Sequence, residues 1–347
     1  MKEKIAFVGA GAVGGYTGGH LARAGHDVTL IDPWPEHIAQ IKTRGLHLGG
    51  TQGDYDVQVK ALHIAEVQSL PPAAIDIAFI CMKLYDTAWA TALIVPYLSP
   101  GGIVVTMQNG LVEEEVARIA GWGRTLGCIA STISVEAVAP GRIVRTQMPG
   151  GDAYTVFRVG ELNGLLTTRA QRIAEMLRAV DSAKVTANLW GERWSKLTGN
   201  TMTTGLSGAS GLDLNQVIDY EPARRLQIRL AAEAIRIGKA AGFKLESIRG
   251  LAADKWLAAA DGDARILAEV EHHMLEGLRL RPEGGRSGTA QDIAKRRRTE
   301  VDFMNGYVAA KGDELRIPAP THAAIAALVR RVERNECVPA RELLQGI

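Results

Sequence analysis

The sequence predicts an α/β fold in which a doubly wound parallel sheet is followed by an all-α C-terminal domain. Two features of the chain predict it. Up to about Lys184, short apolar segments typical of buried strands alternate with helical segments. From Leu189 onward the strand pattern stops and long helical segments follow one another. We therefore expect two domains, residues 1–186 and residues 187–347.

The first strand and the first helix enclose a glycine-rich turn. Residues 4–8 are an apolar run, residues 9–14 read Gly-Ala-Gly-Ala-Val-Gly, and residues 15–24 can form a helix. A G-x-G-x-x-G motif in this context indicates a Rossmann-type dinucleotide site, since its glycines allow a tight turn, the approach of a pyrophosphate and close helix packing. The predicted cofactor contacts are Gly9, Gly11, Ala12, Val13 and Gly14. A glycine-rich turn without a ligand is the alternative.

Asp32 ends the second predicted strand, residues 27–31. A carboxylate at this place can accept hydrogen bonds from both hydroxyls of the adenosine ribose, whereas a 2′-phosphate would meet like charge. The sequence therefore favours NAD(H) over NADP(H). The alternative is an ordinary turn aspartate before Pro33, whose side chain closes the loop.

The rest of the first domain continues the doubly wound pattern. We expect strands at residues 75–81 and 102–107, with helices at 86–98 and 112–120. Gly/Pro turns separate three further strands, which suits an antiparallel extension of the sheet. These strands cover residues 125–135, 142–146 and 154–159, and a last helix covers residues 168–180.

The second domain is predicted to be helical at residues 190–198, 222–241, 264–278, 293–311 and 321–334. Glycine-rich joints are expected at residues 205–211 and 281–288. A nucleotide domain followed by a helical domain predicts a cleft for a small substrate between them. Residues 1–186 would be the dinucleotide-binding domain, and residues 187–347 the substrate and dimerisation domain.

Composition narrows the classes of partner. The formal net charge is +2, which gives no reason to expect nucleic acid or a membrane surface, and residues 295–298 (Lys-Arg-Arg-Arg) are expected to be an exposed stretch of helix. The three cysteines lie far apart without metal-ligand spacing, so we expect no metal site and a cytoplasmic location. The chain enters its first strand directly, leaving no room for a signal peptide, and no apolar run reaches membrane-spanning length.

Apolar helices such as the region around Trp256 are expected to be exposed and to pair in a homodimer.

Five further blocks, together with the glycine-rich turn, resemble the ketopantoate reductase (2-dehydropantoate 2-reductase) family over nearly the whole chain. The block at residues 194–200 and the stretch formed by the two blocks within residues 291–306 are specific. The blocks are Met82-Lys83, Gln108-Asn109-Gly110, Trp194-Ser195-Lys196-Leu197-Thr198-Gly199-Asn200, Gln291-Asp292-Ile293 and Thr299-Glu300-Val301-Asp302-Phe303-Met304-Asn305-Gly306.

The resemblance implies a role for each matching residue. Lys196 would be the general acid, and Asn109 would lie beside the nicotinamide ribose and the reacting carbonyl. Asn200 would bind substrate, Glu300 would hold the nicotinamide ribose or a substrate hydroxyl, and Lys83 would touch the cofactor. A dimer is also implied. Considered without the family, Lys196 would be a surface lysine, Asn109 a turn former, and Glu300 a solvated helix acid pairing with the arginine four residues earlier.

Three positions depart from the family pattern. Where the family has an arginine for the 2′-phosphate of NADP, this chain has Pro33 preceded by Asp32. A second substrate asparagine is Thr204, and a serine before the Gln-Asp pair is Gly288, although the adjacent Ser287 could replace it. The substrate pocket is therefore expected to differ more than the catalytic frame.

These observations predict a nicotinamide-dependent enzyme that reduces a 2-oxo acid, by resemblance 2-dehydropantoate to pantoate. Hydride transfer to a ketone leaves charge on its oxygen, so a proton donor such as Lys196 must lie within hydrogen-bond reach. The alternatives are an NAD-dependent dehydrogenase of another 2-hydroxy acid or a secondary alcohol, and a non-catalytic NAD(H) sensor. The partner expected in either enzyme is a small 2-oxo or 2-hydroxy acid.

Overall fold

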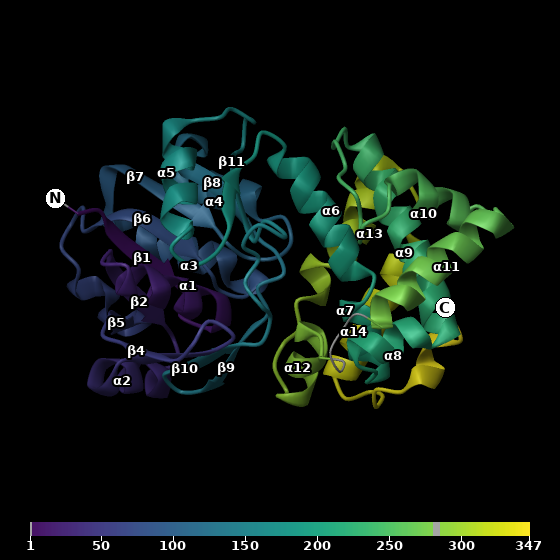
Figure 1. The fold of residues 1–347 in the computed structure, drawn as a ribbon, viewed down its shortest axis with the longest axis horizontal. Coiled ribbons are helices and arrows are strands. Elements are labelled where there is room, and N and C mark those ends of the chain that lie inside the picture. The colour runs from purple at the N-terminus through teal and green to yellow at the C-terminus, as the bar shows by residue number, and fades with distance from the viewer. Residues whose placement is uncertain (1, 280–284) are drawn as a thin grey trace. The chain divides into compact units, whose positions relative to one another are not determined.

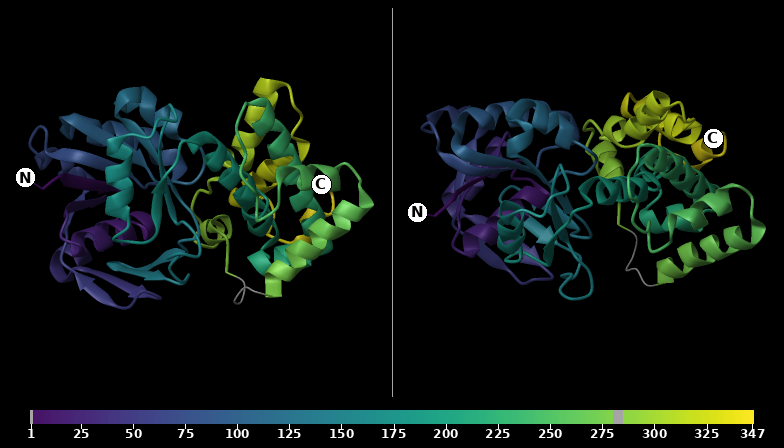
Figure 2. Two further views of the ribbon diagram at one scale, coloured as in Figure 1. Left: turned by 45° about the horizontal axis from the view of Figure 1, so that its top comes forward. Right: turned by 90° about the horizontal axis from the view of Figure 1, so that it is seen from above.

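The computed structural model describes residues 2–279 and 285–347. The chain divides into two compact units, residues 1–189 and 190–347. The division falls at the start of helix α6 (Leu189–Thr201), three residues after the boundary placed from the sequence. Figures 1 and 2 show the elements of each unit, which we describe separately.

Unit 1 is built on an eight-stranded sheet in which neighbours are parallel except for the antiparallel pair β8 and β11. The antiparallel extension expected from the sequence is therefore present at β11. In sheet order the strands are β12 (Ala183–Val185), β11 (Phe157–Glu161), β8 (Thr125–Ala130), β7 (Leu98–Thr106), β6 (Ile75–Ile80), β1 (Lys4–Val8), β2 (Asp27–Asp32) and β5 (Lys60–His63).

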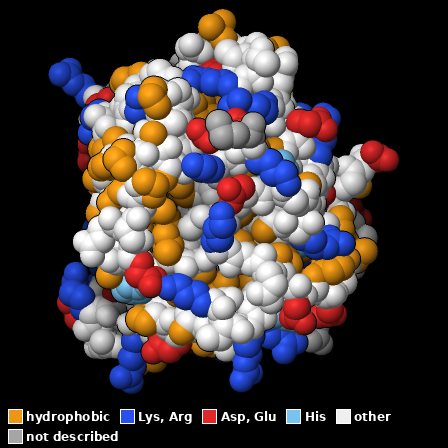
Figure 3. Space-filling model, turned by 90° about the vertical axis from the view of Figure 1, so that its left-hand side faces the viewer, with side chains coloured by type: hydrophobic (Ala, Val, Ile, Leu, Met, Phe, Trp, Pro, Cys, Tyr) orange, Lys and Arg blue, Asp and Glu red, His pale blue; other side chains and the backbone are white. Residues whose placement is uncertain are grey.

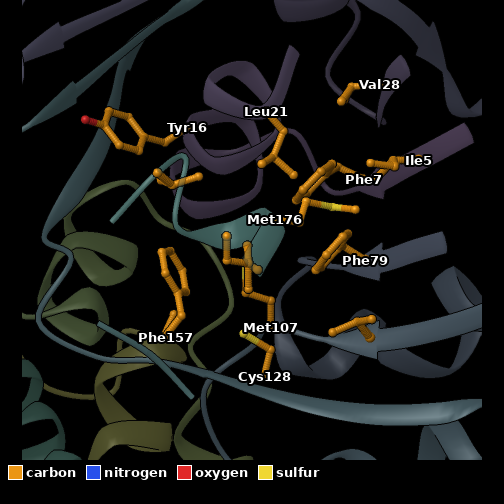
Figure 4. Packing of buried hydrophobic residues seen from close by; sticks show 14 of the residues in the cluster. Ile5, Phe7, Tyr16, Leu21, Val28, Phe79, Met107, Cys128, Phe157 and Met176 are labelled. Atoms are coloured by element: carbon orange, nitrogen blue, oxygen red, sulfur yellow. The ribbon is translucent and has the colours of Figure 1, made fainter. Parts of the chain in front are cut away.

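Helices cover both faces of this sheet, as a doubly wound fold requires. Successive residues of β1 point to opposite faces. Phe7 packs with α1 (Ala12–Arg23) and α5 (Thr168–Leu177), whereas Val8 packs with α3 (Thr87–Ile94) and α4 (Glu113–Ala120). On the first face the rings of Phe7 and Phe79 stack with centroids 4.5 Å apart, next to Met107 and Met176 (Figure 4). These two cores fix the carboxyl edge of the parallel strands, where ligands bind in such folds.

A second sheet of four strands corrects one expectation. Residues 125–135 are not one strand: β8 ends at Ala130, and the hairpin of β9 (Val135–Ala139) and β10 (Arg142–Arg145) leaves the main sheet. It pairs instead with β3 (Leu46–Gly50), to which β4 (Tyr55–Val57) is added. Since this pairing joins segments about 95 residues apart, no local pattern marked it. The short strands β3, β4, β5 and β12 were also missed.

The second sheet lies on the outer side of α1, whose glycines permit the close approach. A Cβ at Gly15 would be 2.5 Å from Ile143 Cδ1, and one at Gly19 would be 2.9 Å from Leu46 Cδ2. An ion pair of 2.5 Å between buried Arg145 and Asp181 ties β10 to the segment before β12. The helix that carries the glycine-rich turn is therefore packed on two sides.

Unit 2 is helical over its described residues. Its helices are α6, α7 (Thr204–Ser210), α8 (Leu214–Asp219), α9 (Glu221–Ala240), α10 (Ala253–Ala260), α11 (Ala264–Arg279), α12 (Gly288–Ala294), α13 (Asn305–Leu315) and α14 (Pro320–Glu333). The expectation of an exposed apolar region around Trp256 is wrong. Trp256 has no exposed surface, because it packs among Ile248, Val270 and their neighbours and donates from its indole to the Ile248 carbonyl.

Two further expectations for unit 2 are wrong. Residues 205–211 are not a loose joint, because Gly205 and Gly208 lie within α7 and allow it to pack against Ile325 and Thr289. Residues 293–311 are not one helix, since α12 ends at Ala294 and α13 begins at Asn305. The basic residues 295–298 are exposed, as expected, but they are not helical. Of the second joint, residues 281–284 lie outside the described residues.

Figure 3 shows one face of the molecule, on which acidic and basic side chains are interspersed with hydrophobic ones. Within the described residues, every helix is too short or too polar to cross a membrane. The same residues contain no group of three or more His, Cys, Asp or Glu side chains placed to hold a metal ion.

Candidate functional site

The glycine-rich turn between β1 and α1 has open space at only one of its three motif glycines. Gly9 has φ +103°, and a Cβ there would be 2.6 Å from the Cys81 carbonyl carbon. A Cβ at Gly14 would be 2.0 Å from the Gly9 oxygen. At Gly11, the N-cap of α1, a Cβ would meet nothing within 4 Å. The turn therefore fits a dinucleotide: two glycines close it tightly, and the third leaves the N-terminus of α1 open to an anion.

Asp32 is 8% exposed and its carboxylate is bonded to the backbone on both sides. One oxygen accepts from the Trp34 amide at 2.9 Å, which closes the turn after β2 as in the alternative stated above. The other accepts from the Ala10 amide at 2.8 Å, within the glycine-rich turn. Burial raises the pKa of this carboxyl. Because each carboxylate oxygen offers two lone pairs, both oxygens can still accept from a ribose hydroxyl.

His37 also holds the glycine-rich turn in place, a role that the sequence did not reveal. It is fully buried, and the Gly141 amide donates to its Nδ1 at 2.9 Å. The proton is therefore on Nε2, which donates to the Ala10 carbonyl at 2.9 Å. Burial lowers the pKa of the ring, which keeps it neutral. Asp32 and His37 thus hold the amide and the carbonyl of the same residue, and they fix the glycine-rich turn against β2 and the β9–β10 hairpin.

Lys83 and Asn109 follow the neighbouring parallel strands β6 and β7, so they lie at the same edge of the sheet. Gln108 joins the two loops: its amide nitrogen donates to the Met82 carbonyl at 3.0 Å and to the Thr87 hydroxyl at 2.8 Å. Asn109 itself is exposed, and Lys83 is half-buried. The structure therefore places both predicted cofactor residues at the edge where the glycine-rich turn also lies.

Helix α6 presents Lys196 and Asn200, four residues apart and partly exposed, on one face. The opposite face is anchored by residues without solvent contact. Trp194 donates from its indole to the Ala234 carbonyl of α9 at 2.8 Å, and Thr198 is fully buried on the same face. The buried face therefore fixes the direction in which Lys196 and Asn200 point.

Two predicted substrate residues meet at the break after α6. Ser287 is 4% exposed and donates to the Thr204 carbonyl at 3.4 Å, while it accepts from the Ala290 amide as the N-cap of α12. Its hydroxyl therefore has a structural use. Thr204 Oγ1 is shielded from solvent and has no hydrogen-bond partner in the described part of the chain. An unpaired shielded hydroxyl is a feature expected of a ligand site.

Arg249 is a second residue that the sequence did not reveal. It occupies a tight turn between Ile248 and Leu251 with φ +50°, a backbone conformation that is strained for any residue but glycine. Its guanidinium donates to the Gly199 carbonyl at 2.9 Å and to the Thr203 hydroxyl at 3.0 Å. Arg249 therefore bridges the end of α6 and the residue before Thr204.

Glu300 lies between α12 and α13, just before a short 3₁₀ turn (Val301–Phe303). The residue before it, Thr299, donates from its amide and its hydroxyl to the Glu333 carboxylate, at 2.7 and 3.1 Å. Because the chain is not helical here, the helical spacing that would pair Glu300 with Arg296 is absent. Glu300 is instead positioned by the bond between Thr299 and α14.

Comparisons with known proteins cover almost the whole chain. The family model described as ketopantoate reductase PanE/ApbA matches residues 5–157, and the one described as its C-terminal part matches residues 188–333. Similar curated proteins include the 2-dehydropantoate 2-reductases of Mesorhizobium japonicum (28% identical, 96% of this chain and 99% of that protein) and Archaeoglobus fulgidus (24%, 95% and 98%).

Solved structures share this fold. A PanE/ApbA family ketopantoate reductase from Ralstonia eutropha JMP134 matches with a TM-score of 0.78 and 26% identity, over 96% of this chain and 99% of that one. D-mandelate dehydrogenase in a ternary structure with NADH and anilino(oxo)acetate matches with a TM-score of 0.79 and 20% identity, over 96% and 98%, a likeness in fold.

Proposed function

Because the chain belongs to the ketopantoate reductase family, an NAD(P)-dependent oxidoreductase family, we propose that it reduces the carbonyl of a 2-oxo acid with NADH. The observation that carries the proposal is the face of α6, where Lys196 and Asn200 stand side by side on a helix whose other face is anchored. A sensor of NAD(H) would need the glycine-rich turn but not this pair.

Lys196 is proposed as the proton donor. NADH, when bound at the glycine-rich turn, would supply the hydride to the carbonyl carbon. The ammonium of Lys196 gives a proton to the carbonyl oxygen, and the resulting amine takes up a proton from water. Asn200, one helical turn further along the same face, donates a hydrogen bond to the substrate. As the family resemblance implies, Asn109 lies beside the nicotinamide ribose and the reacting carbonyl. Glu300 holds the nicotinamide ribose or a substrate hydroxyl, and Lys83 contacts the cofactor.

NADH is proposed over NADPH because of the surroundings of Asp32. The carboxylate stands at the end of β2 and is fixed by the Ala10 and Trp34 amides, so it cannot turn away from a 2′-phosphate. The residues that follow it, Pro33 and Trp34, offer no cation. A 2′-phosphate placed there would meet a buried acceptor group without a compensating positive charge.

A substrate other than 2-dehydropantoate is the second candidate. Thr204 replaces an amide, and the hydroxyl of Ser287 is bonded to the Thr204 carbonyl and the Ala290 amide. The fold neighbour D-mandelate dehydrogenase, which was solved with anilino(oxo)acetate, indicates that this fold can hold an aryl 2-oxo acid. Thr204 and Ser287 would then shape a pocket for a larger apolar group.

The proposed homodimer rests on the family resemblance alone, because the Trp256 region is buried. Light scattering of the purified protein would test it.

The experiment is steady-state reduction of 2-dehydropantoate and of branched and aromatic 2-oxo acids with NADH, for the wild type and Lys196→Ala. Lys196→Ala is expected to lower kcat at least ~100-fold with nearly unchanged NADH affinity, because general acid catalysis acts in the transition state. Lys239→Ala, which removes a surface lysine paired with Asp254, is the matched control. Normal turnover by folded Lys196→Ala would refute the proposed role of this lysine. No turnover of any 2-oxo acid by a wild type that binds NADH would favour the sensor.

A further inference from the structure

Unit 2 contains a hollow of about 460 Å³ between the end of α12, the end of α14 and the chain that follows α12. None of the residues assigned above to cofactor, substrate or proton transfer lines it. Five arginines do: Arg296, Arg297, Arg298, Arg330 and Arg334. A hollow of this size lies within the range of small-molecule sites, about 300–1,000 Å³.

The arginines give the hollow more positive charge than the neighbouring carboxylates and helix ends neutralise. Two carboxylates line the hollow, Asp302 and Glu333, and a third, Glu336, pairs with Arg334, so a net charge of two remains against the five arginines. The carboxyl ends of α12 and α14 contribute about half a negative charge each. A surplus of about one positive charge therefore remains after the helix ends are complemented.

Both carboxylates that line the hollow are already engaged. Asp302 accepts from Arg330 at 2.6 Å, and Glu333 accepts from the amide and hydroxyl of Thr299. By contrast, the guanidinium groups of Arg296 and Arg297 have no hydrogen bond or ion pair with any described residue. Guanidinium groups gathered without partners repel one another, so a site with this composition favours an anion.

The arginine segment is held in place by the backbone. Arg296 has φ +52°, which turns the chain sharply after α12, and its amide donates to the Ile293 carbonyl at 3.0 Å. The Arg297 amide donates to the Asp292 carbonyl at 2.8 Å. Thr299 is bonded to Glu333, as described above. The arginines are thus presented by a fixed turn, at the cost of a strained residue.

We propose that this hollow binds the phosphate groups of a small phosphorylated molecule, through a pyrophosphate or a pair of neighbouring phosphates. Arginine suits this chemistry because its planar fork donates two parallel hydrogen bonds to phosphate oxygens. A ligand with about two negative charges matches the two guanidinium groups of Arg296 and Arg297. Residues of unit 2 line the hollow and residues of unit 1 form the glycine-rich turn, so no residue is shared, and the proposal does not depend on the function proposed above.

The test is calorimetric titration of the full chain with pyrophosphate, with and without NADH, since the glycine-rich turn can itself bind an anion. Wild type is expected to bind one pyrophosphate that NADH does not displace. Arg296→Gln/Arg297→Gln is expected to weaken this binding by at least about tenfold, because charge-assisted hydrogen bonds are lost. Arg334→Gln should weaken it less, because Arg334, the residue after α14, already pairs with Glu336.

The matched control is Arg236→Gln/Arg341→Gln, which removes the same charge from exposed positions that do not line the hollow. It is expected to leave the dissociation constant within about twofold of the wild type. The proposal is overturned if the wild type in NADH binds no pyrophosphate, or if both double variants bind equally well. Tighter binding of a tetraglutamate peptide than of pyrophosphate would also overturn it, because the ligand would then be an acidic peptide.

Discussion

Gly11 and Gly14 lie three residues apart, yet a single methyl group is expected to act in opposite ways at these two positions. Gly11 has φ −66°, which alanine adopts freely, and its Cβ would meet nothing within 4 Å. Gly11→Ala should therefore keep or raise the free energy of unfolding, by up to about 1 kcal/mol, since alanine has less freedom in the unfolded chain. The same methyl group would stand where the pyrophosphate approaches α1, so NADH affinity should fall at least about tenfold, or about 1.4 kcal/mol.

At Gly14 the methyl group has no room in the protein itself. Its Cβ would be 2.0 Å from the Gly9 oxygen and 2.7 Å from Cys81 Cβ. Overpacking of this kind costs typically ~1–3 kcal/mol, and a clash with a backbone oxygen cannot be relieved by a side-chain rotation, so we expect about 3 kcal/mol. Gly14→Ala should therefore lower the free energy of unfolding in the absence of cofactor.

Two measurements separate these effects: urea unfolding without cofactor, and fluorescence titration with NADH. Gly101→Ala is the control, because that Cβ also meets nothing within 4 Å and lies outside the site. It should leave NADH affinity unchanged. If Gly11→Ala binds NADH as tightly as the wild type, the assignment of the glycine-rich turn to the cofactor is refuted. If Gly14→Ala is as stable as the wild type, the packing argument fails.

Three other results are expected. The wild type should have a higher kcat/KM with NADH than with NADPH, and Asp32→Ala should lower kcat/KM more for NADH than for NADPH. A wild-type preference for NADPH would contradict the role of Asp32. Arg249→Gly relaxes the strained backbone but removes the guanidinium and its two hydrogen bonds beside Thr204, so it should raise KM for the 2-oxo acid about tenfold at unchanged KM for NADH. The surface control Arg236→Ala should leave both KM values unchanged. An unchanged KM for the 2-oxo acid in Arg249→Gly would show that this bridge does not position the substrate. Burial lowers the pKa of His322 from 6.5 to about 4, so only the unfolded chain takes up this proton as the pH first falls below 6.5, and unit 2 should lose about 3 kcal/mol of stability between pH 7 and 4. Hydrogen exchange of α14 should show this loss in the wild type and in the exposed-site control His272→Gln, but not in His322→Gln. Equal pH dependence in all three proteins would contradict the prediction.

The sequence predicted those parts of the fold that local patterns determine. The apolar run of β1, the glycine-rich turn and the length of α9 follow from residues within one segment, and the structure confirms them with shifts of a few residues. The second sheet did not follow, because β3 pairs with β10 about 95 residues later. Helical periodicity also failed over residues 293–311, where the bonds between Thr299 and Glu333 hold a non-helical segment that a periodic pattern cannot reveal.

The same division applies to the candidate site. Lys196 and Asn200 share a face because of helical spacing alone, so their juxtaposition could be read from the sequence. The bonding of Asp32 to Ala10 joins residues 22 apart across a strand–helix–strand unit, and only part of it, the turn at Trp34, is local. His37 and Arg249 carry no motif at all. They act on Ala10 and on the break after α6 through contacts 27 to 50 residues away in the chain.

The difference between residues placed by local spacing and residues placed by distant contacts bears on substrate choice. Lys196, the proposed proton donor, stands in the regular part of α6, where Trp194 anchors the opposite face, so substitutions elsewhere can leave it in place. Thr204 stands after the break, where Arg249 donates to the hydroxyl of the preceding Thr203 and Ser287 donates to the carbonyl of Thr204. A change at either of these two residues would move Thr204 without moving Lys196. The substrate can therefore change while the reaction is kept, and specificity in this chain is expected to follow residues that carry no recognisable motif.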